Sequence, residues 1–215
     1  MEIAPAILVL LILSGLATYK GLQDYAFFGK YNFNLDRIRK GEVYRLLTSG
    51  FLHVDWMHFA FNMFTLYMFA GIVVAISGSF YFLIIYLVSI LIGNILTYQL
   101  YHKRSQYLAV GASGGVTGIV YASILLYPDL KLYLFFIPIG IKGYIFALAY
   151  LLYSLYGMKK NRDNIGHAAH FGGAIGGLVF TLVRYPSLFQ TQTFLIGLLL
   201  IPLVLLFVLA QRNKL

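Results

Sequence analysis

Seven apolar runs, separated by polar connections, constrain this chain more than any other feature of its sequence. They lie near Ile3–Tyr19, His58–Ile76, Phe80–Tyr101, Gly114–Tyr127, Gly143–Gly157, Ala168–Val183 and Phe194–Ala210. A helix needs about 20 apolar residues to cross a bilayer, and shorter spans are tolerated where other helices bury them. No ten-residue alternation recurs as a transmembrane barrel requires. The pattern therefore predicts an all-α polytopic membrane protein.

The composition supports this class and excludes others. Hydrophobic residues make up 60% of the 215 residues and charged residues 11%, whereas ordinary globular domains carry about 25% charged residues. A disordered chain needs the opposite balance. The absence of cysteine excludes disulfides, thiolate nucleophiles and cysteine-ligated metal sites. The net charge of +9 would suit nucleic acid, but the Lys and Arg residues lie almost wholly between the runs, so no nucleic-acid partner is expected.

The first run has a competing interpretation as a signal peptide. It lacks a basic leader and a clear small-residue cleavage site, which favours a span. Two connections are long. Residues 20–50 hold six Lys and Arg residues. The Pro128–Lys142 connection contains three residues that oppose a continuous helix, namely Pro128, Pro138 and Gly140.

Three groups of polar residues lie in or beside the apolar runs, where such side chains are costly and therefore functional candidates. They are His53, His58 and Asn62; the segment Gly111–Gly115, which reads Gly-Ala-Ser-Gly-Gly; and His167 with His170. Each group alone has a structural explanation, as an interface histidine, a packing asparagine or a glycine-rich helix contact. If the chain alternates sides, however, all three groups lie at the same membrane face, which predicts a single site.

The residue types in these groups favour nucleophilic catalysis. A serine such as Ser113 is a weak nucleophile until an adjacent base accepts its proton, and His170 is the histidine expected to do so. Small residues on two helices let their backbones approach closely. Such faces occur on the two helices concerned, as Gly114 with Gly118 and as Gly173 with Gly177.

Attack on a carbonyl develops an oxyanion, and each preorganised donor to it lowers the barrier by about 3–4 kcal/mol. The expected donors are the side chains of His58 and Asn62 and the backbone N–H groups of Ala112 and Ser113. None of the seven Asp and Glu residues lies within a run, so a dyad is predicted rather than a triad. The nucleophile elbow of α/β-hydrolases shares the Gly-x-Ser-x-Gly pattern, but it needs a strand–turn–helix in a soluble sheet.

With these residues in place, the chain resembles the rhomboid family of intramembrane serine proteases. Three ordered elements carry the resemblance: His58 to Asn62 for H-x-x-x-N, Gly111 to Gly114 for G-x-S-G, and Ala169 to Gly177 for A-H-x-x-G-x-x-x-G. The resemblance implies a single domain over residues 1–215, with a rhomboid-like six-helix core at about 1–185. It also implies an extra C-terminal transmembrane helix at about 193–210, the six-plus-one type.

The resemblance also implies a function. Ser113 and His170 would form the catalytic dyad, and His58 and Asn62 would stabilise the oxyanion. The substrates would be membrane-anchored proteins, cut in or near a transmembrane segment within the lipid bilayer. The run near Gly143–Gly157 and the connection after it would gate access. Neither a metal nor an organic cofactor is implied, and the oligomeric state is left open.

The chain departs from the family pattern at two positions. Tyr44-Arg45 stands where the family's first loop usually has Trp-Arg, and the structural role of the arginine is expected to persist. Val74 stands where many members carry a glutamate, a difference expected to affect local packing rather than catalysis. His53 and His167 are expected to support the site or lie at the interface, with a direct role left open.

The distribution of charge conflicts with the orientation that the resemblance implies. Loops and the tail on the site's side hold 13 Lys and Arg residues, whereas the opposite side holds only Lys131, Lys142 and Arg184. The positive-inside rule would make the site's side cytoplasmic, whereas the family's site opens to the outside. A folded first loop would weaken the charge signal. We expect the outside orientation, in a prokaryotic plasma membrane.

Two other functions compete with a protease. A non-catalytic rhomboid-like protein that binds or escorts membrane clients typically lacks the serine or the histidine, and this chain has both. A small transporter would place polar residues at the bilayer midplane on discontinuous helices. Here the polar groups lie toward one face and the two halves do not repeat. The sequence therefore favours the serine endopeptidase.

Overall fold

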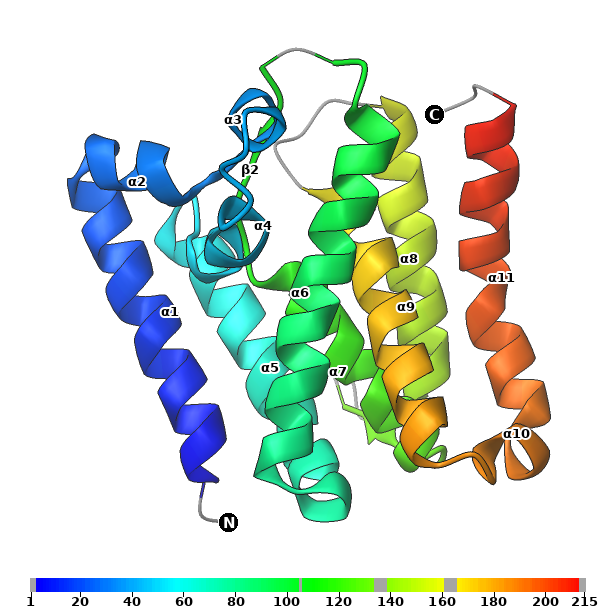
Figure 1. Cartoon of the computed structure of the whole chain (residues 1–215). Helices are drawn as coiled ribbons and strands as arrows, with labels where there is room; N and C mark the ends of the chain where they lie inside the picture. Colours follow the sequence, from blue (N-terminus) through cyan, green and yellow to red (C-terminus); the bar gives the residue numbers. More distant parts are fainter. Residues whose placement is uncertain (1–2, 105, 134–138, 161–165, 213–215) are drawn as a thin grey trace.

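A long helix stands in place of each apolar run. In the computed structural model, which describes residues 3–104, 106–133, 139–160 and 166–212, these helices lie side by side along one axis (Figure 1). They are α1 (Pro5–Gln23), α5 (Trp56–Ser77), α6 (Ser79–Tyr101), α7 (Ser113–Leu126), α8 (Gly143–Lys160), α9 (His167–Arg184) and α11 (Thr193–Gln211). The short helix α10 (Leu188–Thr191) joins α9 to α11. The all-α polytopic class predicted from the sequence is confirmed.

The helices differ in whether their length and hydrophobicity would let them cross a membrane. Among the described residues, α1, α5, α6 and α11 are long and apolar enough to cross one. Helix α7 has 14 residues and is therefore only about 21 Å long, less than the ~30 Å of the hydrocarbon core. Its residues Gly114 to Leu125 are all buried, the condition under which a short span is tolerated. The count of six core spans plus one stays a prediction.

The connection between α1 and α5 folds over one end of the bundle (Figure 1). We call residues 24–51 loop 1. It contains α2 (Tyr25–Tyr31), β1 (Phe33–Asn34), α3 (Leu35–Arg39), α4 (Arg45–Thr48) and a 3-10 helix, Ser49–Phe51. Strand β1 pairs antiparallel with β2 (Leu108–Ala109), with Phe33 opposite Ala109. Phe33, Leu35 and Ile38 form a small buried core, so loop 1 is a folded unit rather than a polar linker.

Arg45 holds loop 1 together. Its guanidinium is buried and donates to the carbonyl oxygens of Gly29 at 2.8 Å and Asn32 at 2.9 Å. It also pairs with Glu42, whose carboxylate lies 2.7 Å from the Arg45 Nη2. The hydrogen bond from Arg45 holds the pKa of Glu42 below its ordinary value, against the opposing effect of desolvation. Arg45 therefore has the structural role in the first loop that the sequence predicts.

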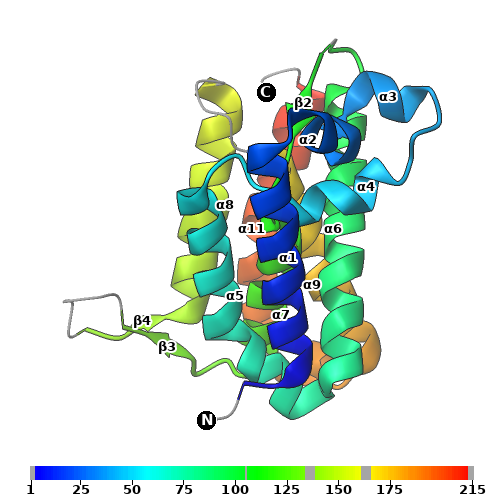
Figure 2. The ribbon, with the colours of Figure 1, turned by 90° about the vertical axis from the view of Figure 1, so that its left-hand side faces the viewer.

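The connection between α7 and α8 leaves the bundle as a hairpin (Figure 2). Strands β3 (Lys131–Leu132) and β4 (Ile141–Lys142) pair antiparallel, with Lys131 opposite Lys142. The helix break expected around Pro128 and Gly140 is present, and Pro138 lies outside the described residues. Val74, on α5, is half-buried and packs against the main core.

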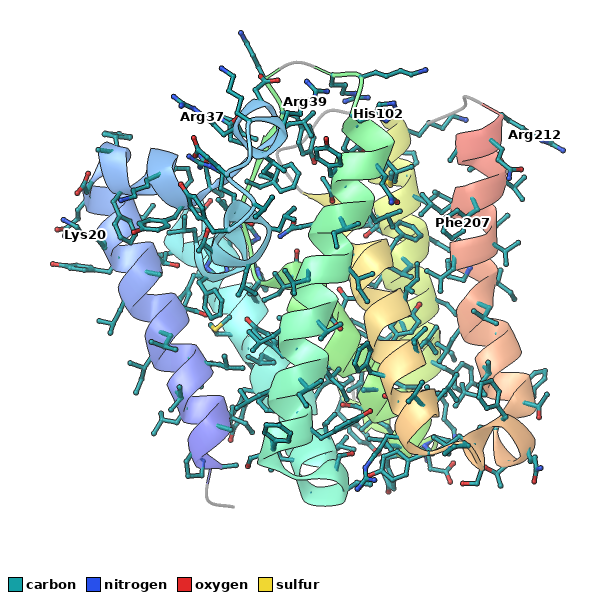
Figure 3. All side chains as sticks on the ribbon, in the orientation of Figure 1. Lys20, Arg37, Arg39, His102, Phe207 and Arg212 are labelled. Atoms are coloured by element: carbon teal, nitrogen blue, oxygen red, sulfur yellow. The ribbon has the colours of Figure 1, made fainter. Side chains whose placement is uncertain are left out.

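Basic side chains gather at the end of the bundle that carries loop 1. Figure 3 shows five such side chains there, Lys20, Arg37, Arg39, His102 and Arg212. Phe207 projects instead from the flank of α11 and is 48% exposed, as expected for a lipid-facing side chain. The charge asymmetry of the sequence is thus an asymmetry between the two ends of the bundle.

Candidate active site

Helices α7 and α9 meet through the four glycines singled out in the sequence. A Cβ atom at Gly173 would overlap the Gly114 carbonyl oxygen, and one at Gly177 would overlap the Gly118 carbonyl oxygen. A third helix joins them, because a Cβ atom at Gly93 of α6 would lie 2.6 Å from the carbonyl oxygen of Ala169 on α9. Small residues are what permit backbones this close. The contact fixes how the N-terminal ends of α7 and α9 lie relative to each other.

Ser113 and His170 lie beside a further approach between the two helices. A Cβ atom at Gly114 would lie 3.3 Å from the Ala169 carbonyl oxygen, so the residue after Ser113 lies close to the residue before His170. His170 is 3% exposed, and its Nε2 has no hydrogen-bond partner among the described residues. A buried polar atom without a partner is costly. The unpartnered nitrogen makes His170 a candidate for a catalytic or ligand-binding role.

Gly111 brings His58 to the same place. Its φ of +134° lies in the left-handed region that favours glycine. A Cβ atom there would lie 2.9 Å from the Nε2 of His58 and 3.8 Å from the Oγ of Ser113. The imidazole of His58 and the hydroxyl of Ser113 thus border one small space, which any larger residue at position 111 would fill.

The start of α5 orients His58 and Asn62. The side chain of Asp55 caps this helix and accepts the His58 backbone N–H at 2.7 Å. Asn62 is buried, and its Nδ2 donates to the His58 carbonyl oxygen at 3.0 Å. A carboxamide nitrogen carries two hydrogens, so Asn62 keeps a second one for another acceptor.

The Ala112 N–H, one of the four expected oxyanion donors, is bound to His53. It donates to the Nε2 of this fully buried histidine at 3.3 Å. The Nδ1 of His53 lies 2.9 Å from the Thr18 hydroxyl, and because Nε2 accepts, Nδ1 carries the proton. The Ser113 N–H differs, since it lies in the first turn of α7, which no side chain caps and where N–H groups lack intrahelical acceptors.

Two residues of α8 contact His170, and sequence reasoning missed both. The Oγ of Ser154 lies 2.8 Å from the Nδ1 of His170. The ring of Tyr150 stacks on the imidazole, with centroids 4.9 Å apart and planes 28° apart. The sequence did contain a signal for them. Ser154 is a polar residue inside an apolar run, and Tyr150 lies four residues earlier on the same helix face. His167 meets the imidazole edge-on at 5.8 Å.

These groups suit acyl transfer. They comprise a serine hydroxyl, a buried imidazole with a vacant nitrogen, and donors from a second histidine, an asparagine and a helix N-terminus. Within the described ranges, no three His, Asp or Glu side chains gather as a metal ion would need.

Comparison with known proteins gives relatives of one kind. The chain is 30% identical over 158 residues to the "RHOMBOID-like protein 12, mitochondrial" of Arabidopsis thaliana, which covers 66% of this chain and 46% of that protein. It is 27% identical over 153 residues to the "Presenilin-associated rhomboid-like protein, mitochondrial" of Mus musculus, covering 68% and 40%. The chain thus spans less than half the length of these two relatives.

A bacterial relative is similar over more of its length. The "Putative rhomboid protease YdcA" of Bacillus subtilis is 30% identical over 148 residues, which are 68% of this chain and 69% of that protein. A family model described as the rhomboid domain matches residues 40–187. This match covers loop 1 from Lys40 onward, the helices α5 to α9 and every residue of the candidate site except Thr18. The chain belongs to the rhomboid family.

Proposed function

We propose that this rhomboid-family protein is an intramembrane serine endopeptidase that cleaves membrane-anchored proteins in or near their transmembrane segments. One observation carries the proposal. The glycine contact between α7 and α9 puts Ser113 beside the helix of His170, whose buried Nε2 has no partner among the described residues. A Ser–His dyad requires a hydroxyl nucleophile and an imidazole nitrogen that accepts its proton. Ser113 and His170 share no hydrogen bond in this structure, so the proposal requires that they draw together when substrate binds.

In the first step, the Oγ of Ser113 attacks the carbonyl carbon of the scissile peptide bond while its proton passes to the Nε2 of His170. The carbonyl oxygen becomes an oxyanion. Three donors serve it: the Ser113 backbone N–H, the His58 side chain and the second Nδ2 hydrogen of Asn62. Each such donor lowers the barrier by about 3–4 kcal/mol.

In the second step, the tetrahedral intermediate collapses and the C–N bond breaks. The leaving amine takes the proton from His170, which leaves an ester on Ser113. A water molecule then gives its proton to His170 and attacks the ester, and the carboxylic acid product leaves as the Ser113 hydroxyl is restored.

The substrate would enter beside α8. The ring of Phe146 on this helix stacks against Phe69 of α5 at 6.0 Å, and displacement of these rings would open a path between the two helices. The connection after α8 includes residues 161–165, which lie outside the described residues, so the gating proposal depends on α8. The site is proposed to face outward from a prokaryotic plasma membrane.

Labelling with a fluorophosphonate in detergent tests the proposal. Wild type, Ser113→Ala and His170→Ala are compared, with Ser123→Ala as the control for a buried serine far along α7. Labelling of the wild type and the control, and its loss in both dyad variants, is the expected result. A well-folded wild type that stays unlabelled and cleaves no model transmembrane substrate would instead support a client-binding rhomboid-like protein.

A further inference from the structure

We propose that Ser154 is a positioning residue for His170, whose Nδ1–H it accepts, so that the Nε2 lone pair is left free for the proton of Ser113. The inference rests on the proposed function and adds to it. The dyad predicted from the sequence acquires an uncharged third member, which comes from α8.

The contact between these side chains is short and enclosed. The Ser154 Oγ lies 2.8 Å from the His170 Nδ1, within hydrogen-bond range. Ser154 is 0% exposed and His170 is 3% exposed, so bulk water does not compete for either atom. The two residues lie on different helices, α8 and α9. The hydrogen bond therefore depends on the packing of these helices rather than on local chain geometry.

The direction of this hydrogen bond differs between two forms of the imidazole. A neutral histidine carries its proton on one ring nitrogen and accepts at the other. With the proton on Nδ1 and donated to Ser154, Nε2 has a lone pair and acts as the base toward Ser113. With the proton on Nε2 instead, the ring cannot accept a proton there. Since a serine hydroxyl can accept or donate, its role in this bond decides whether His170 is a competent base.

The same hydrogen bond strengthens during the reaction. Once Nε2 takes the proton of Ser113, the imidazole becomes a cation, and its Nδ1–H donates a charge-assisted bond that is roughly twice as strong as a neutral one. Ser154 thus stabilises the state after proton transfer more than the state before it. This differential interaction is what accelerates a chemical step.

Tyr150 complements Ser154 from the same helix face. Its ring stacks on the imidazole at a centroid distance of 4.9 Å, which fixes the plane of the ring while Ser154 fixes its rotation within that plane. A hydroxyl suits this location better than a carboxylate, because an ionised side chain among apolar helices is costly. Ser154 orients the base without burying a charge.

Substitution at Ser154 tests the proposal in the full-length protein. Ser154→Ala removes the acceptor, Ser154→Thr keeps the hydroxyl, and Ser123→Ala removes a fully buried serine hydroxyl that donates to Phe69 and Ile119. We expect Ser154→Ala to lower kcat and the rate of fluorophosphonate labelling by about 10- to 100-fold, with KM nearly unchanged. Ser154→Thr should recover most of the rate, and Ser123→Ala should match the wild type.

Two kinetic results would overturn the proposal. The first is a Ser154→Ala protein that is labelled as fast as Ser123→Ala. The second is a Ser154→Thr protein that is labelled as slowly as Ser154→Ala, while both variants unfold at the same temperature as Ser123→Ala. That result would mean that the packing of the side chain matters rather than its hydroxyl. Nitrogen NMR of histidine-labelled wild type, with His170→Ala for assignment, reads the tautomer directly. A bare Nε2 and a protonated Nδ1 are expected, and the reverse would contradict the proposal.

The NMR measurement also separates this inference from the proposed function. A wild type that is never labelled, yet has the expected tautomer that Ser154→Ala disturbs, would refute the protease while the hydrogen bond stands. A labelled, active wild type whose Ser154→Ala variant is unaltered would leave the protease in place and refute the role of Ser154.

Discussion

The backbone N–H of Ala112 donates to the Nε2 of His53 over 3.3 Å. The other nitrogen of this imidazole meets Thr18 on α1 at 2.9 Å. A single buried ring therefore ties the residue before Ser113 to the first helix of the chain. It also occupies an N–H that the sequence assigned to the oxyanion, so His53 supports the geometry of the site through the backbone.

Removal of this imidazole should loosen the segment before Ser113. His53→Ala leaves the buried Ala112 N–H without its acceptor, which costs about 1–3 kcal/mol, and we expect a lower unfolding temperature together with slower fluorophosphonate labelling. Thr18→Val keeps the ring and removes only its second partner, so its effect should be smaller. Equal labelling rates in wild type and His53→Ala would show that the segment holds its shape without the ring.

The glycine contact between α7 and α9 should tolerate no added side chain. Gly173→Ala places a Cβ atom on the Gly114 carbonyl oxygen and Gly177→Ala places one on that of Gly118, so the helices must separate. Overpacking of this kind costs about 1–3 kcal/mol, and the displacement of Ser113 from His170 should slow labelling further.

A matched control lies on α11. Gly197 is exposed, and a Cβ atom there would meet nothing within 4 Å. Gly197→Ala should therefore be neutral or stabilising by up to about 1 kcal/mol. Thermal unfolding in detergent compares the three variants. A Gly173→Ala or Gly177→Ala protein as stable and active as Gly197→Ala would contradict the close contact between α7 and α9.

Loop 1 should weaken in acid through Glu42. The hydrogen bond from Arg45 lowers the pKa of Glu42 below its ordinary 4.5, so the folded protein binds this proton less readily than the unfolded chain. The stabilisation is complete above pH 4.5 and is lost as the pH falls through the lowered pKa. Unfolding temperatures measured across this range should fall less steeply for Glu42→Gln than for wild type. Parallel curves would mean that the ion pair does not contribute.

The orientation of the bundle can be decided with one introduced cysteine, because the chain contains none. Lys159→Cys lies near the end of α8 and is exposed; we expect an impermeant thiol reagent to label it in intact cells. Lys131→Cys, in the hairpin between α7 and α8, should be labelled only after lysis. The reverse pattern would agree with the positive-inside rule and would place the site on the cytoplasmic side.

The sequence by itself determined the class of this protein and most of its elements. The apolar runs predicted all of the long helices, because the need to satisfy backbone groups in lipid leaves a polytopic chain little choice but helix. The same constraint makes polar residues within a span conspicuous, so Ser113, His170, His58 and Asn62 could be selected without a structure. The folded character of loop 1 was not predictable in detail, since its short strand β1 pairs with residues more than 70 positions away.

Only the tertiary structure decided which of these groups meet. Helices that are apolar on nearly every side carry no amphipathic stripe to indicate which face turns toward which neighbour. The sequence therefore could not place Ser154 and Tyr150 against His170, or commit the Ala112 N–H to His53. The close approach of glycine backbones sets how α6, α7 and α9 cross, but the contacts to His170 come from α8 and the contact to Ala112 comes from the segment before α5. Such packing depends on three-dimensional fit rather than on the pattern along one helix.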